Sequence, residues 1–237
     1  MRRLLTTLFA ISCLSCISGA HATDAPAQPS PIHWQYKLSD AVVTTTDTDG
    51  KTTHSLNMDV VDYFLQTISG YVDQYAAGSG DAAEEGDVTE KLTRLTAVLH
   101  ELDDGPKVNL DILRREAFAY NLAYKRGFPG ADPMTDVLYK RLLKQTPDEP
   151  AANYLYGAYL AGHDAARAKS IPYLKKALKL GVKKANLTLG IVYVSLGEKQ
   201  KGLDCLQQYS ADFPDDQRPG MIIQAVKNKD AQGSQSD

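Results

Sequence analysis

Leu189–Pro214 reads LGIVYVSLGEKQKGLDCLQQYSADFP, and its glycines and proline carry a clear structural signal. Gly190 and Gly202 are small enough for two helices to approach each other closely, and Gly197 between them breaks the chain. Pro214 ends the second helix, because proline cannot continue a helix interior. The stretch therefore predicts a pair of helices joined by a short turn.

The same pattern occurs three times along the chain. Leu122-Ala123, Tyr156-Gly157 and Leu189-Gly190 align without gaps, at spacings of 34 and 33 residues. In the first copy we expect a helix over 110–126 and a second one that is capped by Asp132-Pro133. Self-similarity at this period indicates a stack of helix-turn-helix units, none of which buries its apolar face alone.

The offsets of Leu189-Gly190, Tyr193, Gly202 and Pro214 resemble those of the tetratricopeptide repeat. The string Tyr173–Gly181 (YLKKALKLG) is also similar to the related Sel1-like repeat. The resemblance implies an all-α fold, a short right-handed α-solenoid with three repeats over 107–216. It also implies that the first helix of each pair lines a concave groove that binds a partner.

The family's groove positions map onto seven residues of this chain: Tyr120, Tyr124, Tyr154, Ala158, Leu187, Ile191 and Val194. Tyrosine suits an interface because its ring buries area while its hydroxyl finds a partner. The alternative is that these side chains pack repeat against repeat, and for the last three packing is the favoured interpretation. The family's carboxylate-clamp members use Lys and Asn at these positions, so their acidic ligand does not fit this chain.

Different patterns flank the repeats. Residues 32–56 contain a Thr-rich run around Asp49-Gly50, which predicts a small β-hairpin. Residues 57–106 predict a helix pair, a degenerate repeat or a cap. Its first helix is capped by Asn57 or Asp59, and its second begins with the capping box Asp87-x-x-Glu90. Residues 217–229 predict a C-terminal capping helix, and 230–237 a disordered tail.

The N-terminus has the features of an export signal. Arg2-Arg3 precedes an apolar run, and Ala20-His21-Ala22 forms a small-x-small cleavage site. We therefore expect a signal peptide over 1–22, cleavage after Ala22, a flexible lead-in over 23–31, and a periplasmic or secreted protein. A lipid anchor at Cys16 is the less favoured alternative, because the residues before it fit a lipobox poorly.

The net charge and the cysteine content limit the possible binding partners and chemistry of the protein. The formal charge is −3, and loss of Arg2 and Arg3 would make it −5, which argues against nucleic acid. Cys205 would be the one cysteine of the mature chain, and a small buried residue is the favoured interpretation over a reactive thiol. The lysines from Lys175 to Lys184 are interpreted as a solvated helix face rather than an anion site. No stretch after the signal is apolar enough to span a bilayer.

The sequence predicts no catalytic, cofactor-binding or metal-binding residues. His33, His54, His100 and His163 have no partner at metal-ligand spacing. The calcium-like Asp47-x-Asp49-Gly50 lacks both end ligands. We therefore expect a non-enzymatic module that holds a peptide or helix of an envelope or secretion partner. The alternatives are an inhibitor or immunity protein that neutralises a secreted toxin, and an enzyme with a dispersed site.

Overall fold

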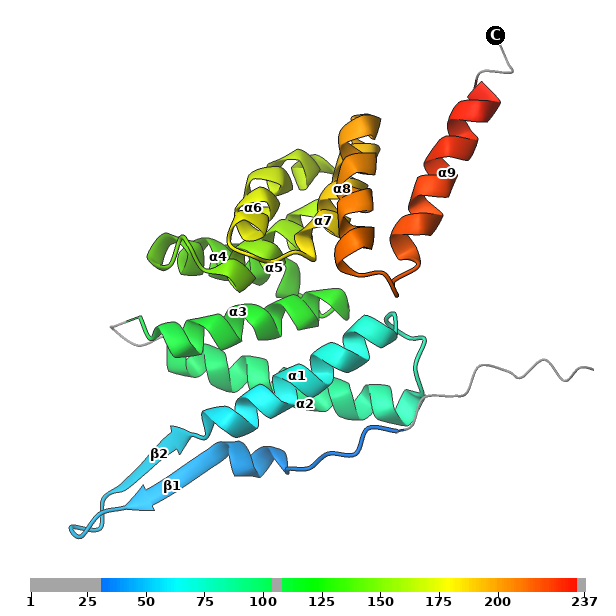
Figure 1. Ribbon diagram of the computed structural model, residues 1–237. Helices are drawn as coiled ribbons and strands as arrows, with labels where there is room; N and C mark the ends of the chain where they lie inside the picture. Colours follow the sequence, from blue (N-terminus) through cyan, green and yellow to red (C-terminus); the bar gives the residue numbers. More distant parts are fainter. Residues whose placement is uncertain (1–30, 104–107, 234–237) are drawn as a thin grey trace, which may run out of the picture. The chain divides into compact units, whose positions relative to one another are not determined.

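The structure is a computed structural model, and it describes residues 31–103 and 108–233. Within them lie nine α-helices and a two-stranded antiparallel sheet (Figure 1). The prediction of a mainly α fold with a small β element is confirmed. The expected signal peptide, the lead-in up to residue 30 and the predicted end of the N-terminal helix pair at residue 106 lie outside the described residues. The account below concerns the unit from Trp34 onward.

The β-hairpin forms where the sequence predicts it. A 3₁₀ turn, Leu38–Ala41, leads into β1 (Val42–Thr46), which pairs with β2 (Thr52–Leu56). The Asp47 carboxylate accepts the backbone N–H groups of residues 49 and 51 at 3.0 and 2.8 Å, which closes the turn. Gly50 has a φ of +79°, a left-handed conformation that glycine adopts without strain. The acidic residues here therefore stabilise a turn.

The N-terminal helix pair consists of α1 (Met58–Gln74) and α2 (Ala82–Asp103). The Asn57 side chain caps α1, as one of the two predicted options. The predicted start of α2 at a capping box of Asp87 and Glu90 is wrong. Asp81 caps the helix instead, because its carboxylate accepts the N–H groups of residues 83 and 84 at 3.0 and 3.1 Å. Asp87 lies within the helix and pairs with Lys91 one turn later.

Three further helix pairs follow in the predicted region. They are α3 (Leu110–Lys125) with α4 (Ala131–Gln145), α5 (Pro150–Ala161) with α6 (Arg167–Lys179), and α7 (Ala185–Ser195) with α8 (Lys199–Asp212). The predicted cap of α4 is wrong by two residues. Left-handed Gly130 precedes the helix, so Asp132 and Pro133 already lie in its first turn. Proline is tolerated there because the N–H groups of the first turn have no intrahelical partner.

Small residues bring the helices of the last two pairs into close contact. A Cβ atom on Gly157 would lie 2.7 Å from Leu174, and one on Gly190 would lie 2.6 Å from Leu206. A Cβ atom on Gly202 would lie 2.9 Å from the backbone oxygen of Gly190. Real Cβ atoms do not approach other atoms this closely, so each pair depends on its glycines. The prediction of close packing at residues 190 and 202 is confirmed.

The last helix, α9 (Arg218–Gly233), packs against α8 and α7. Val226 is buried, whereas Met221 is 63% exposed. The helix extends beyond the predicted end at residue 229, so the expectation of disorder over 230–233 is wrong. Residues 234–237 lie outside the described residues. Contact with α7 places α9 where the first helix of a fourth repeat would lie, which fits a capping role.

Candidate functional site

The first helices of the three pairs form a continuous row. α3 contacts α5, α5 contacts α7, and α7 contacts α9. Each of α3, α5 and α7 carries two predicted groove residues four positions apart, which places them on one helix face. These pairs are Tyr120 with Tyr124, Tyr154 with Ala158, and Leu187 with Ile191. We call this row the first-helix face.

Tyr120 and Tyr124 are half-buried in contacts between helices. The Tyr120 ring meets His100 of α2 edge-on, with centroids 6.3 Å apart. The Tyr124 ring meets Tyr159 edge-on at 5.1 Å and stacks on His163 at 5.4 Å. These two tyrosines therefore connect α3 to its neighbouring helices and leave only part of each ring accessible.

Tyr154 lies at the contact of α5 with α7. Its side chain forms a hydrogen bond with that of Thr188, and the Lys184 ammonium lies 4.6 Å above its ring. Burial raises the pKa of Tyr154, and the charge of Asp73 adds to that increase. The phenol is therefore neutral at physiological pH and available as a donor. Ala158, one turn on, is half-buried.

The three aliphatic positions of α7 differ in exposure. Ile191 is 44% exposed and Leu187 is half-buried. Val194 faces α8, because its Cγ2 would lie 2.6 Å from a Cβ atom on Gly202. Ile191 is thus the most accessible apolar side chain among the predicted groove residues, and Val194 holds the two helices of the third pair together.

A polar cluster behind Tyr124 was not predicted from the sequence. The Tyr159 hydroxyl donates to Asp132 Oδ1 at 2.6 Å, and His163 Nε2 lies 3.0 Å from the same oxygen. Asp132 was expected to cap a helix, and it serves instead as the acceptor for two side chains of the next repeat. Burial raises the pKa of Tyr159, and the hydrogen bond to Asp132 contributes. The cluster therefore fixes α4 against α5.

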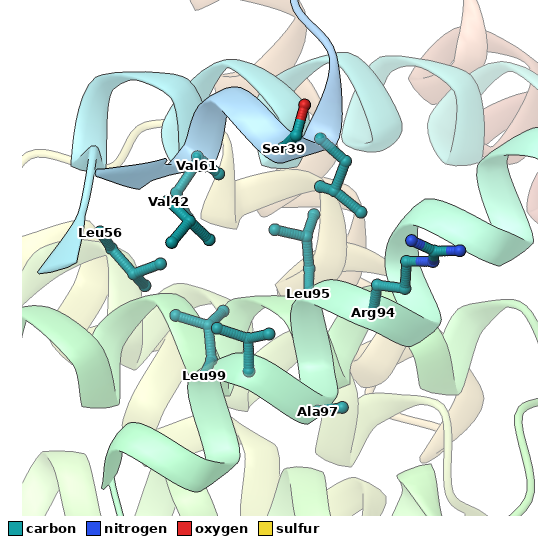
Figure 2. Close-up of a pocket in the computed structure, with 11 residues that line it drawn as sticks. Ser39, Val42, Leu56, Val61, Arg94, Leu95, Ala97 and Leu99 are labelled. Atoms are coloured by element: carbon teal, nitrogen blue, oxygen red, sulfur yellow. The ribbon is translucent and has the colours of Figure 1, made fainter. Parts of the chain in front are cut away.

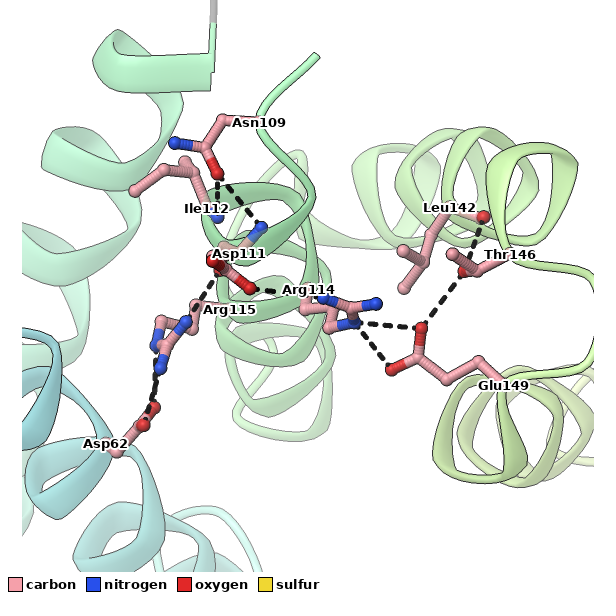
Figure 3. A network of polar contacts seen from close by, with 9 residues as sticks. All are labelled: Asp62, Asn109, Asp111, Ile112, Arg114, Arg115, Leu142, Thr146 and Glu149. Atoms are coloured by element: carbon pink, nitrogen blue, oxygen red, sulfur yellow. Dashed lines mark hydrogen bonds and ion pairs between the residues drawn. The ribbon is translucent and has the colours of Figure 1, made fainter.

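Arginines of α3 connect it to both neighbours (Figure 3). Arg115 binds both carboxylate oxygens of Asp62 on α1 at 2.7 and 2.6 Å. Arg114 binds both oxygens of Glu149 at 2.9 Å, immediately before α5. Arg115 uses two nitrogens, so its contact fixes orientation as well as distance, whereas both Glu149 oxygens share the single Nε–H of Arg114. The two arginines position α3 between the N-terminal helix pair and the second repeat.

An apolar pocket of about 400 Å³ lies between the hairpin, α1 and α2 (Figure 2). Its walls include the fully buried Val61 and Leu99 together with the exposed Val42 and Val98. Arg94 lies at its edge and pairs with Glu90 at 2.9 Å. The sequence pattern did not reveal this pocket, because its walls come from three elements that are distant in sequence.

Basic side chains form a second cleft of about 450 Å³, lined by Lys140, Lys144 and Lys176. Lys140 pairs with Asp136 at 2.5 Å, and Lys176 pairs with Asp148 at 2.9 Å. These carboxylates offset much of the positive charge of the cleft. The ion pair of Lys176 and the contact of Lys184 with Tyr154 fit the interpretation of a solvated helix face.

A buried acidic pair lies where α2, α3 and α4 meet. Glu116 of α3 is fully buried, and its Oε1 lies 2.7 Å from His100 Nδ1. Asp103 of α2 is also buried and pairs with Arg141 of α4. Burial raises the pKa of Glu116 to about 7. Such a carboxyl group is suited to acid–base chemistry, but full burial keeps Glu116 out of reach of a substrate.

Cys205 is half-buried on α8. Burial raises the pKa of its thiol, and the charge of Asp204 adds to the increase. A raised pKa disfavours the reactive thiolate.

Within residues 31–103 and 108–233, no three His, Cys, Asp or Glu side chains come together as a metal site. In the same part of the chain, no helix combines the length and the apolarity needed to cross a bilayer. No protein-family model, curated protein or solved structure matches this chain.

Proposed function

We propose that the protein is a non-enzymatic, tetratricopeptide-like interaction module that binds a peptide or helix of a protein partner on the first-helix face. The observation that carries the proposal is the row of α3, α5 and α7, each in contact with the next. Such a row presents side chains from several repeats to one extended ligand.

The chemistry of this face favours an apolar or amphipathic ligand. Ile191 is exposed, and the other predicted residues on α3, α5 and α7 are half-buried. Tyr154 supplies part of a ring and a neutral hydroxyl, whereas Leu187 and Ile191 supply aliphatic area for the apolar positions of a bound helix. Lys184, above the Tyr154 ring, adds one positive charge at the edge.

We also propose that the module acts in the periplasm or after secretion, on the basis of Arg2-Arg3, the apolar run and Ala20-His21-Ala22. Its partner would then belong to the envelope or the secretion machinery. N-terminal sequencing of the exported protein should begin at Thr23, and a full-length cytoplasmic product would contradict this location.

The structure allows a sharper test than removal of the tyrosines, whose rings also pack between helices. Ile191→Arg introduces a charge at an exposed position of the first-helix face. We expect the amount of partner recovered by crosslinking in the native envelope to fall at least tenfold. The thermal melting curve should stay close to wild type, because substitution of an exposed side chain disturbs little packing.

Val137→Arg is the matched control. Val137 lies on α4, a second helix, and is 54% exposed. This variant adds the same charge away from the first-helix face and should retain full recovery of the partner. Equal recovery with both variants would contradict binding at this face.

A further inference from the structure

The junction of α2 with the repeats contains two carboxyl groups that are both removed from water. Glu116 has no exposed surface, and Asp103 is 3% exposed. Asp103 follows His100 by three residues on α2, and His100 Nδ1 lies 2.7 Å from Glu116 Oε1, so the two carboxyl groups are neighbours. Two ionised carboxylates cannot hydrogen-bond to each other, because each offers only acceptors. A hydrogen bond between them requires that one of the two carries a proton.

The remaining oxygens support this assignment. Among the described residues, Glu116 Oε2 and Asp103 Oδ1 have no donor when both groups are treated as acceptors. Buried polar atoms in folded proteins are seldom left without a partner. A proton on Glu116 Oε2 that is donated to Asp103 Oδ1 satisfies both oxygens at once. The ion pair with Arg141 favours the negative charge on Asp103, so the proton belongs to Glu116.

Three helices contribute the side chains around the two carboxyl groups. His100 and Asp103 come from the last turn of α2, Tyr120 and Glu116 come from α3, and Arg141 comes from α4. Three carboxylates on the other elements packed against α3 are engaged elsewhere. Asp62 and Asp73 of α1 bind Arg115 and Lys125, and Glu149 before α5 binds Arg114.

We propose that the Asp103–Glu116 pair is a pH-sensitive clasp, which holds the C-terminal end of α2 on α3 and α4 while one proton is shared and loosens that end when the proton is lost. Deprotonation leaves two neighbouring negative charges out of water, with the Arg141 guanidinium paired to Asp103 and the His100 ring against Glu116. Their repulsion acts on the last turn of α2, because Asp103 is its final residue.

The direction of the pH dependence follows from the protonation states. Burial is the largest cause of the raised pKa of Glu116, which is about 7 in the folded protein against an ordinary 4.5. The folded state therefore binds more protons than the unfolded state between these values. Its stability must fall as the pH rises through this window and level off above pH 7. The folding equilibrium constant should fall on the order of a hundredfold across the window.

Glu116→Gln isolates the clasp. The glutamine amide donates to Asp103, accepts from His100 and cannot ionise, so it mimics the protonated form at every pH. Denaturant unfolding between pH 5 and 8.5, followed by the fluorescence of the single tryptophan Trp34, should show a loss of stability in the wild type that the variant lacks. Above pH 7.5 the variant should be more stable than the wild type.

Glu101→Gln is the control, because Glu101 is an exposed carboxylate on the same turn of α2. It removes the same charge and should keep the pH dependence of the wild type. Hydrogen exchange, corrected for the intrinsic effect of pH, should show that protection of amides 96–103 in the wild type falls between pH 5 and 7 and levels off above pH 7, whereas protection in Glu116→Gln stays constant.

A carboxyl ¹³C titration of Glu116 in the intact protein gives a readout that does not depend on any variant. A midpoint near 7 supports the clasp, and a midpoint near 4.5 would overturn it. Identical pH dependence of stability in the wild type and Glu116→Gln would also overturn it. So would unchanged protection of amides 96–103 across the window.

Discussion

The contact between α7 and α8 and the contact of α3 with the N-terminal helix pair are built in different ways. In the first, Gly190 and Gly202 let two backbones meet, and the surrounding side chains are apolar. In the second, buried charged groups such as Arg126 and Glu116 hold the helices. The repeat contact joins elements that are adjacent in sequence. The N-terminal contact joins α3 to the preceding helix α2 and, across 53 residues of sequence, to α1, and it relies on charge pairs that fit in one geometry.

Removal of Arg126 should lower the free energy of unfolding more than the other substitutions do. It tests the contact of α3 with the N-terminal helix pair, which relies on charged groups. The Arg126 side chain is 2% exposed, pairs with Glu85 of α2, and donates to the Tyr75 carbonyl after α1 at 2.9 Å. Arg126→Met keeps the aliphatic stem but removes the donor to the Tyr75 carbonyl and the cation beside Glu85, which still accepts the Gly78 N–H. We expect the free energy of unfolding to fall by about 3 kcal/mol in denaturant melts.

Arg94→Met is the control for this loss. Arg94 pairs with Glu90 on the surface of α2, and both side chains are at least 60% exposed. Exposed pairs of this kind contribute about 0–1 kcal/mol, so the melt should hardly move. Equal losses in both arginine variants would show that the N-terminal contact does not depend on its buried charges.

An added methyl group at Gly202 tests the apolar side of the comparison. The new Cβ would lie 2.9 Å from the Gly190 oxygen and 3.0 Å from the Val194 nitrogen, and both are backbone atoms that cannot rotate away. Gly202→Ala must therefore separate α7 from α8. We expect a loss of about 2 kcal/mol, although alanine is the better helix former. A gain in stability would contradict the close contact.

Replacement of Gly86 by alanine should change the free energy of unfolding the least, and it should raise it instead of lowering it. Gly86 lies inside α2, and a Cβ atom there would meet nothing within 4 Å. Gly86→Ala should raise the melting midpoint and stabilise the protein by about 0.5–1 kcal/mol, through helix propensity alone. A loss at this position would show that α2 does not continue through residue 86.

The helices of the repeats could be predicted because their signals are local. Glycine at residue 197, with a φ of +80°, and proline at residue 214 mark the ends of α7 and α8. The start of α2 was misplaced because Asp87-x-x-Glu90 is a valid capping pattern that occurs inside a helix. Asp81, six residues earlier, has the same type of side chain. It is the actual cap, because its carboxylate accepts the N–H groups of residues 83 and 84.

The sequence predicted the candidate site less well than it predicted the helices. The repeat offsets place Tyr124 and Ile191 at equivalent positions, yet one ring packs between Tyr159 and His163 while the other side chain is 44% exposed. Exposure depends on the neighbouring helix, which the offsets do not describe. The apolar pocket beside the hairpin was missed for the same reason.

The number and type of elements in the repeat region follow from local sequence signals. Helical periodicity, turn glycines and prolines act over a few residues, and no distant contact is needed to interpret them. Which side chains are buried, which tyrosines pack and which carboxyl groups meet depends on how the helices are arranged in space. The sequence pattern singles out neither Glu116 nor Asp103. Their proton is shared because folding removes both from water and brings them into contact.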